Sequence, residues 1–137
     1  MLIIYMYLRN FTCNIILTTI PHLFGLFFTF DNFFYSSIII SSTLTSILWH
    51  RKREPNNILL YLDYGSAGIL SFYEIYRSYY NGLFTIALCS NIYVLLFNKI
   101  IYILSNEGVI KYSLWHSFYH ILSSVKTILL AFLNCNL

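Results

Sequence analysis

Two histidines four residues apart, His116 and His120, carry the clearest chemical signal in the sequence. On a helix this spacing places both imidazoles on one face, one turn apart. A helix that presents two imidazoles in this way can offer two nitrogen ligands to one metal ion. The same spacing also fits two separately hydrogen-bonded histidines, so the pair alone does not decide between the two.

Three more polar residues lie in or beside apolar segments that could meet this pair. His50 ends one apolar segment, Ser46 precedes it by one helical turn, and Asp63 lies near the start of the next segment. If the segments alternate in direction, all of these residues and the histidine pair reach a similar depth on one side of a membrane. Three imidazoles and one open position are typical of catalytic zinc. We therefore predict that His50, His116 and His120 bind zinc, that Asp63 binds the zinc water or orients a ligand, and that Ser46 faces the same cavity.

Simpler interpretations stay open for each residue outside the pair. His50 adjoins the basic run 51–53 and can be a solvated boundary residue. Ser46 can donate to the carbonyl four residues earlier on its own helix, as serines in membrane helices often do. His22, directly after Pro21, has no partner that spacing identifies, and we interpret it as structural.

Charged residues inside apolar segments have structural interpretations too. Asp63 can form a buried ion pair with Arg53 or Lys111. Lys126 is expected to pair inside the helical bundle or to extend its amine to the membrane surface. The three cysteines have no metal-like spacing, and their odd number gives no disulfide framework.

The elements that must position these residues follow from an unusual composition. Of the 137 residues 58% are hydrophobic and 9% are charged, whereas soluble domains are about 25% charged. The 20% aromatic content argues against disorder. A net charge of +3, with no basic stripe, argues against nucleic acid as a partner. We expect one all-α integral membrane domain over residues 1–137, with membrane lipid as its partner and its oligomeric state left open.

The hydropathy pattern predicts about five membrane-spanning helices, since each needs about 20 residues. Pro21 is expected to kink the first of them, and polar residues separate the others. A loop after the third helix is expected over 77–81. The predicted spans are roughly 11–30, 33–50, 58–76, 82–104 and 112–133.

The positions of the basic residues predict the orientation. Cytoplasmic loops are enriched in lysine and arginine. With a cytoplasmic N-terminus, six of the eight basic residues lie at the inner boundary, and only Arg77 lies outside. The sequence start lacks the pattern of a secretory signal, so we expect the N-terminal segment to be retained.

The combination of Ser46-x-x-x-His50, Asp63 and His116-x-x-x-His120 resembles the CREST superfamily. That superfamily includes alkaline ceramidases, the progestin and adiponectin receptors, and the transmembrane-protein-8 type proteins. Segments 62–66 and 116–120 are most similar to its myomaker-like group. The resemblance implies zinc held by the three histidines, assisted by the serine and the aspartate. It also implies a seven-helix bundle, which this chain would shorten to about five helices.

Two functions of different classes are compatible with these residues. In the first, a zinc site with Asp63 and Ser46 as catalytic residues hydrolyses an amide or ester bond of a membrane lipid. In the second, which the myomaker-like resemblance favours, the zinc is structural and the protein acts in fusion, membrane remodelling or partner binding without catalysis. A third interpretation is a helical bundle without metal.

Overall fold

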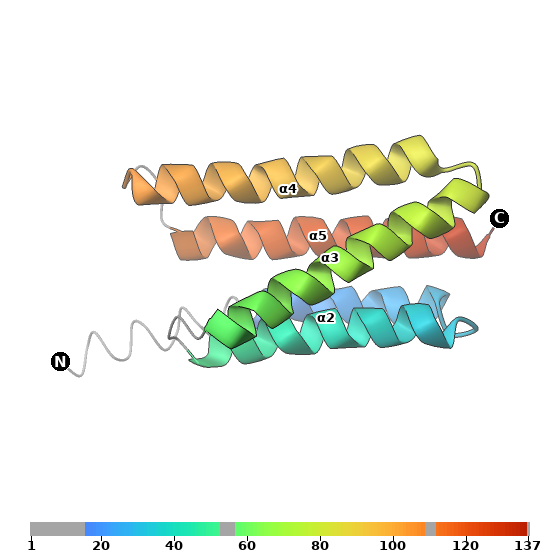
Figure 1. The fold of residues 1–137 in the computed structure, drawn as a ribbon, viewed down its shortest axis with the longest axis horizontal. Helices are drawn as coiled ribbons and strands as arrows, with labels where there is room; N and C mark the ends of the chain where they lie inside the picture. Colours follow the sequence, from blue (N-terminus) through green and yellow to red (C-terminus); the bar gives the residue numbers. More distant parts are fainter. Residues whose placement is uncertain (1–15, 53–56, 109–111, 137) are drawn as a thin grey trace.

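The computed structural model describes residues 16–52, 57–108 and 112–136, and all of their regular elements are helices (Figure 1). The predicted all-α class is therefore confirmed for this part of the chain. In chain order the elements are η1 (Ile20–Phe28), α2 (Phe33–Lys52), α3 (Asn57–Tyr80), α4 (Phe84–Asn106) and α5 (Tyr112–Cys135).

The first predicted helix differs most from the structure. Its residues 11–15 lie outside the described part of the chain, and residues 16–19 are α-helical. From Ile20 the chain winds more tightly as the 3₁₀ helix η1, with Pro21 in its first turn. Proline lacks the N–H that would continue the α-helical bonding, so the expected kink takes the form of a change of helix type.

The predicted loop at 77–81 is wrong for its first four residues, because α3 continues to Tyr80. The sequence there contains no helix breaker, and the chain turns only at Gly82, whose φ is 71°. The Leu83 amide donates to the Ser78 carbonyl at 2.7 Å, and the Gly82 amide donates to the Tyr79 carbonyl at 3.3 Å. These two bonds form a Schellman closure, for which glycine is the favoured residue.

Helix α5 occupies the middle of the bundle (Figure 1). It packs against η1 on one side and α4 on the other, while α3 crosses it diagonally from α2 towards α4. Gly25 permits the close packing of η1, since a Cβ there would lie 3.3 Å from Ile39 Cδ1 and 3.5 Å from Thr127 Cγ2. Helices α2, α3, α4 and α5 alternate in direction (Figure 1). One end of the bundle therefore holds the end of α2, the start of α3 and the start of α5.

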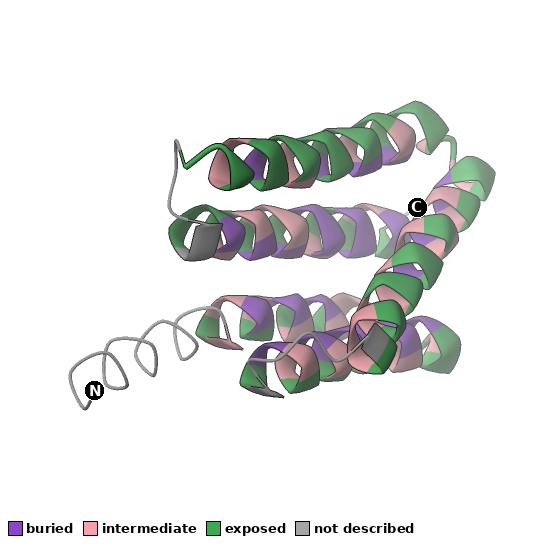
Figure 2. Ribbon diagram, turned by 60° about the vertical axis from the view of Figure 1, so that its left-hand side comes forward, coloured by how far each residue is buried: buried purple, intermediate pink, exposed green. Residues whose placement is uncertain are grey.

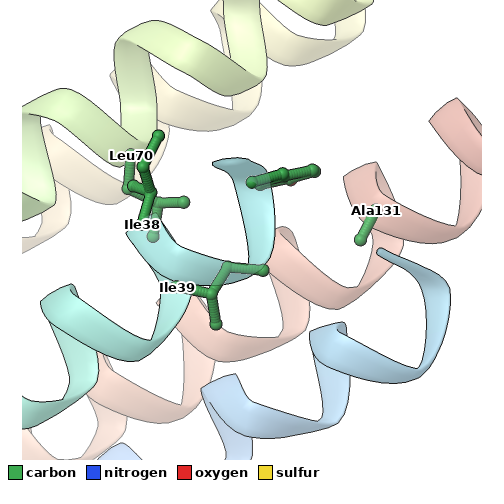
Figure 3. Packing of buried hydrophobic residues seen from close by; sticks show 5 residues of the cluster. Ile38, Ile39, Leu70 and Ala131 are labelled. Atoms are coloured by element: carbon green, nitrogen blue, oxygen red, sulfur yellow. The ribbon is translucent and has the colours of Figure 1, made fainter. Parts of the chain in front are cut away.

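A small apolar core joins α2, α3 and α5 near the other end of the bundle. Figure 3 shows Ile38, Ile39, Leu70 and Ala131 there, and Tyr35 completes the cluster. Figure 2 shows that each helix has buried and exposed faces. Most other buried side chains are polar, whereas large apolar side chains are exposed. Water-soluble proteins show the reverse distribution, so this surface suits lipid better than water.

Two of the described helices are long and apolar enough to cross a membrane, namely α4 and residues Leu114–Cys135 of α5. The predicted spans at 33–50 and 58–76 do form the helices α2 and α3. Serine and threonine in α2, and tyrosine with charged residues in α3, lower the hydropathy of these two helices. The multi-pass arrangement and the cytoplasmic N-terminus stay predictions.

Candidate metal centre

The three histidines predicted as ligands come together at one end of the bundle. The Nε2 atom of His120 lies 3.0 Å from Nε2 of His50 and 3.2 Å from Nε2 of His116. All three side chains are buried, with exposed fractions of 8% for His50, 3% for His116 and 5% for His120. Their candidate ligand atoms lie within 4.8 Å of one another, so the group could hold a metal ion.

Hydrogen bonding within this group cannot satisfy all three rings at once. Each imidazole nitrogen carries either one proton or one lone pair. Nε2 of His120 faces two other nitrogens, so it can form a good hydrogen bond with only one of them. A shared cation would accept a lone pair from each ring, and nitrogen ligands of one tetrahedral zinc lie about 3.3 Å apart. The observed separations of 3.0 and 3.2 Å fit this arrangement closely.

Aromatic neighbours fix the orientation of the imidazoles. The Trp49 ring lies 4.5 Å from the His50 ring and 6.3 Å from the His116 ring, measured between centroids. On the other side, Tyr119 stacks on His116 at 5.4 Å with an interplanar angle of 23°. These packed rings restrict the rotamers of the ligands, which keeps the three nitrogens pointed at one position.

A cavity of about 40 Å³ adjoins the histidines, and Ser46, Asp63, His116 and His120 are among its lining residues. A volume of this size has room for water, which needs about 10–15 Å³ per molecule. The prediction that Asp63 and Ser46 share a cavity with the histidine pair is confirmed at this level. Asp63 is not a member of the close three-histidine group.

Ser46 is buried, and its hydroxyl makes no hydrogen bond of ordinary geometry with any described residue. It interacts with the Asp63 carboxyl across the cavity, but outside ordinary hydrogen-bond geometry. The alternative in which Ser46 donates to the carbonyl four residues earlier is therefore wrong.

The other simple interpretations have different outcomes. His50 is buried, so its interpretation as a solvated boundary residue is wrong. Pairing of Asp63 with Arg53 or Lys111 cannot be judged, because both basic residues lie outside the described part of the chain.

His22 lies beside the metal centre and has partners that sequence spacing did not identify. Its Nε2 lies 3.1 Å from the Ser123 hydroxyl, and its Nδ1 lies 2.7 Å from the Ser124 hydroxyl. Ser124 also donates to the His120 carbonyl at 2.7 Å. His22 therefore connects η1 to the turn of α5 that follows the ligand pair, which agrees with its structural interpretation.

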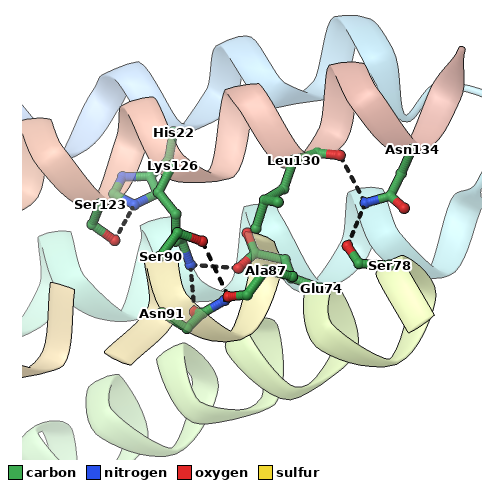
Figure 4. Close-up of polar contacts among 10 residues, drawn as sticks. All are labelled: His22, Glu74, Ser78, Ala87, Ser90, Asn91, Ser123, Lys126, Leu130 and Asn134. Carbon is green, nitrogen blue, oxygen red and sulfur yellow. Dashed lines mark hydrogen bonds and ion pairs between the residues drawn. The ribbon is translucent and has the colours of Figure 1, made fainter. Parts of the chain in front are cut away.

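A second buried polar group lies further along α5, and we call it the Lys126 cluster: Lys126, Glu74 and Asn91. Lys126 Nζ donates to Glu74 Oε2, and to Asn91 Oδ1 at 2.9 Å (Figure 4). The predicted pairing of Lys126 inside the bundle is thus confirmed. Sequence reasoning missed Glu74 and Asn91, although an acidic residue within a predicted span is a signal that can be read directly.

Comparisons of the chain with family models, with curated proteins and with solved structures find no match. The similarity to the CREST superfamily therefore depends only on the short motifs quoted above. The three-histidine group stands independently of that similarity, because it follows from the distances between the ring nitrogens.

Proposed function

We propose that this chain is a multi-pass membrane protein in which His50, His116 and His120 hold a zinc ion. We further propose that the centre hydrolyses an amide or ester bond of a membrane lipid. The convergence of three buried imidazole nitrogens within 4.8 Å of one another, with His120 Nε2 within hydrogen-bond distance of the other two, is the observation that carries this proposal. Three nitrogen ligands with a further open position are the usual protein contribution to a catalytic zinc site.

The membrane location is supported by the distribution of side chains. Large apolar residues point outwards along the helices, while polar residues fill the interior. Helix α4 and most of α5 have the length and hydropathy of membrane spans. In the proposed arrangement α2 and α3 also cross the bilayer, with their polar faces turned to the interior, and the N-terminus is cytoplasmic.

Two residues of the cavity have the chemistry that hydrolysis requires. A catalytic zinc ion lowers the pKa of bound water to about 7. The Asp63 carboxylate can hold a water molecule in the cavity and take up its proton. The Ser46 hydroxyl, which has no ordinary hydrogen bond in the fold, can donate to the oxygen of a carbonyl under attack. Both residues line the same cavity as His116 and His120.

The position of Asp63 favours catalysis over a purely structural zinc. Structural zinc sites are closed by four protein ligands, and direct ligation by Asp63 would supply the fourth. Its carboxylate lies outside the close three-histidine group and lines the adjoining cavity instead. This arrangement supports a centre with space for water and for a reacting group.

Metal content tests the proposal first. We would purify the chain in mild detergent and count metal ions per chain by mass spectrometry. We expect about one zinc per parent chain, none in the double variant His116→Ala/His120→Ala, and an unchanged amount in His22→Ala. A folded parent chain that carries no zinc would overturn both the catalytic and the structural zinc proposals.

Activity then separates the two zinc proposals. Ceramides and phospholipids would be presented in mixed micelles to the zinc-loaded parent chain and to Asp63→Ala. We expect the parent to release fatty acid and Asp63→Ala to retain zinc while losing most of that activity. Equal zinc and no hydrolysis in either protein would favour a structural zinc in a non-enzymatic membrane protein.

A further inference from the structure

A larger cavity lies mainly among α3, α4 and α5. It adjoins the 40 Å³ cavity at the histidines and shares lining residues with it, among them His22, Tyr64 and Tyr119. Its volume is about 260 Å³, and its apolar walls include Ala67, Leu70 and Val94. Tyr64 on α3 and Leu95 on α4 also line it, and these side chains are 53% and 60% exposed. The cavity therefore opens between α3 and α4, on a side of the bundle that would face lipid.

The inner end of this cavity is polar, because Lys126 and Asn91 line it. The Lys126 ammonium has three N–H donors, and two of them are used for Glu74 and Asn91. The Asn91 amide has two N–H donors, and one of them is used for the Ala87 carbonyl at 2.9 Å. No bond to a described residue uses the remaining donor of either group. The cavity thus ends at two buried donors that can serve a guest molecule.

The charge at this end indicates what kind of group fits. Glu74 is fully buried and pairs directly with Lys126 (Figure 4), so the two charges offset each other. An anionic guest would have to compete with Glu74 for the ammonium, and a cationic guest would meet Lys126 itself. An uncharged oxygen acceptor, such as a hydroxyl or a carbonyl, can use the spare donors without disturbing the pair.

We propose that this cavity binds a single-chain lipid with an uncharged oxygen-rich head, of which a monoacylglycerol is the simplest example. The head lies against Lys126 and Asn91, and the chain passes between α3 and α4 into the bilayer. Lys126 follows His120 by six residues, about 9 Å along a helix axis. Lys126 and Asn91 line only the larger of the two adjoining cavities, so the proposed head contacts depend on the proposed membrane location but not on zinc.

Two glycines of α3 provide a matched test. A Cβ at Gly65 or at Gly68 would meet nothing within 4 Å, so both positions accept a side chain. Only Gly68 lines the cavity. Leucine at either position also raises helix propensity to the same extent. Gly68→Leu should therefore fill the cavity, while Gly65→Leu should leave it open and the fold equally stable.

The probe is a monoacylglycerol with a diazirine in its acyl chain, photolysed with the purified chain in detergent and mapped by peptide mass spectrometry. We expect labels on α3, α4 and α5 that excess monoolein displaces. Labelling should fall at least fivefold in Gly68→Leu and stay unchanged in Gly65→Leu. Equal labelling in the two variants, or labels that monoolein does not displace, would overturn the proposal.

Head-group preference and metal dependence complete the test. Diazirine analogues of oleic acid and oleylamine should label the cavity less than the monoacylglycerol does, and a reversed order would overturn the assignment of an uncharged head. Labelling should persist in His116→Ala/His120→Ala, which has lost the metal ligands. The lipid site can therefore fail while zinc binding succeeds, and zinc binding can fail while the lipid site succeeds. A parent chain without displaceable label, in which the cavity holds only water, would also overturn the proposal.

Discussion

Two of the buried polar clusters on the described part of α5, the Lys126 cluster and the three-histidine group, meet the cost of burial in different ways. In the Lys126 cluster the ammonium donates directly to one carboxylate oxygen of Glu74 and to the Asn91 amide oxygen. In the metal centre three imidazoles face one another through nitrogens that cannot all be satisfied by protons. One cluster offsets its charge within the chain, whereas the other could hold a cation from outside.

This difference assigns the two clusters different parts in the protein. A group whose buried polar atoms find partners within the chain can hold helices together without a ligand. A group of buried imidazole nitrogens that face one another is a candidate for binding a ligand, and such groups are often functional sites. The predictions below change one cluster at a time, and they are ordered from the largest expected effect to the smallest.

The largest effect should come from Lys126→Met. The substitution leaves the Glu74 carboxylate fully buried without its cation, and breaking a buried pair in this way costs about 3–5 kcal/mol. We expect a loss of that size in the free energy of unfolding, measured in mild detergent by circular dichroism during denaturation. A loss below about 1 kcal/mol would show that Glu74 takes up a proton or reaches water at little cost.

The double variant Glu74→Leu/Lys126→Met is the control. Replacing a whole buried pair with apolar residues is often neutral or stabilising, so the double variant should be clearly more stable than Lys126→Met alone. If the two proteins lose the same free energy, the apolar stem of Lys126, rather than its charge, accounts for the effect.

The sequence predicted the proximity of His50, His116 and His120 better than it predicted the Lys126 cluster. His116 and His120 lie one turn apart on a helix, so their proximity follows from local geometry. His50 could be added because chain direction and segment length set its depth in the bundle. Glu74 and Asn91 offer no such local relation to Lys126. The Glu74 contact depends on the diagonal path of α3 across α5, and the Asn91 contact on the packing of α4 against α5. Hydropathy determines neither.

The helix boundaries show a similar division. The apolar segments located α2, α4 and α5 well, because long apolar runs form helices in either a bilayer or a protein core. The extension of α3 to Tyr80 was missed because Arg77 was taken to mark a loop, although arginine is a good helix former. Pro21 predicted a kink but not the 3₁₀ winding of η1, and the close packing of Gly25 against Ile39 and Thr127 is a tertiary contact that a single sequence does not show.

Removal of the metal should have the next largest effect. A ligand at about 100 times its dissociation constant stabilises the native state by about 2.7 kcal/mol. A strong zinc chelator should therefore lower the free energy of unfolding of the parent chain by about that amount, measured in the same detergent. The double variant His116→Ala/His120→Ala should not respond to the chelator. An equal response in both proteins would place the metal effect outside the metal centre.

A smaller loss is expected for Asn91→Leu, which removes one partner of the Lys126 ammonium but leaves the ion pair intact. Hydrogen bonds to charged groups contribute about 1.5–3 kcal/mol, and the Asn91 side chain is buried. We expect the free energy of unfolding to fall by about 2 kcal/mol. Ser90→Ala, whose hydroxyl donates only to the Ala87 carbonyl of the same helix, should change it by less than about 0.5 kcal/mol. Similar losses in the two variants would mean that Asn91 does not support the ion pair.

The smallest effect on stability should come from Ser46→Ala at the metal centre. The Ser46 hydroxyl is buried without an ordinary hydrogen bond, so its removal should change the free energy of unfolding by less than about 0.5 kcal/mol or stabilise the fold. Thr43→Val is the matched control one turn earlier, since its hydroxyl donates to the Ile39 carbonyl at 2.8 Å and should cost about 1 kcal/mol. Lipid hydrolysis should nevertheless fall in Ser46→Ala and persist in Thr43→Val. The opposite pattern, with Ser46→Ala unstable but fully active, would make Ser46 a structural residue. Both buried clusters would then contribute to stability, and the contrast between them would be smaller.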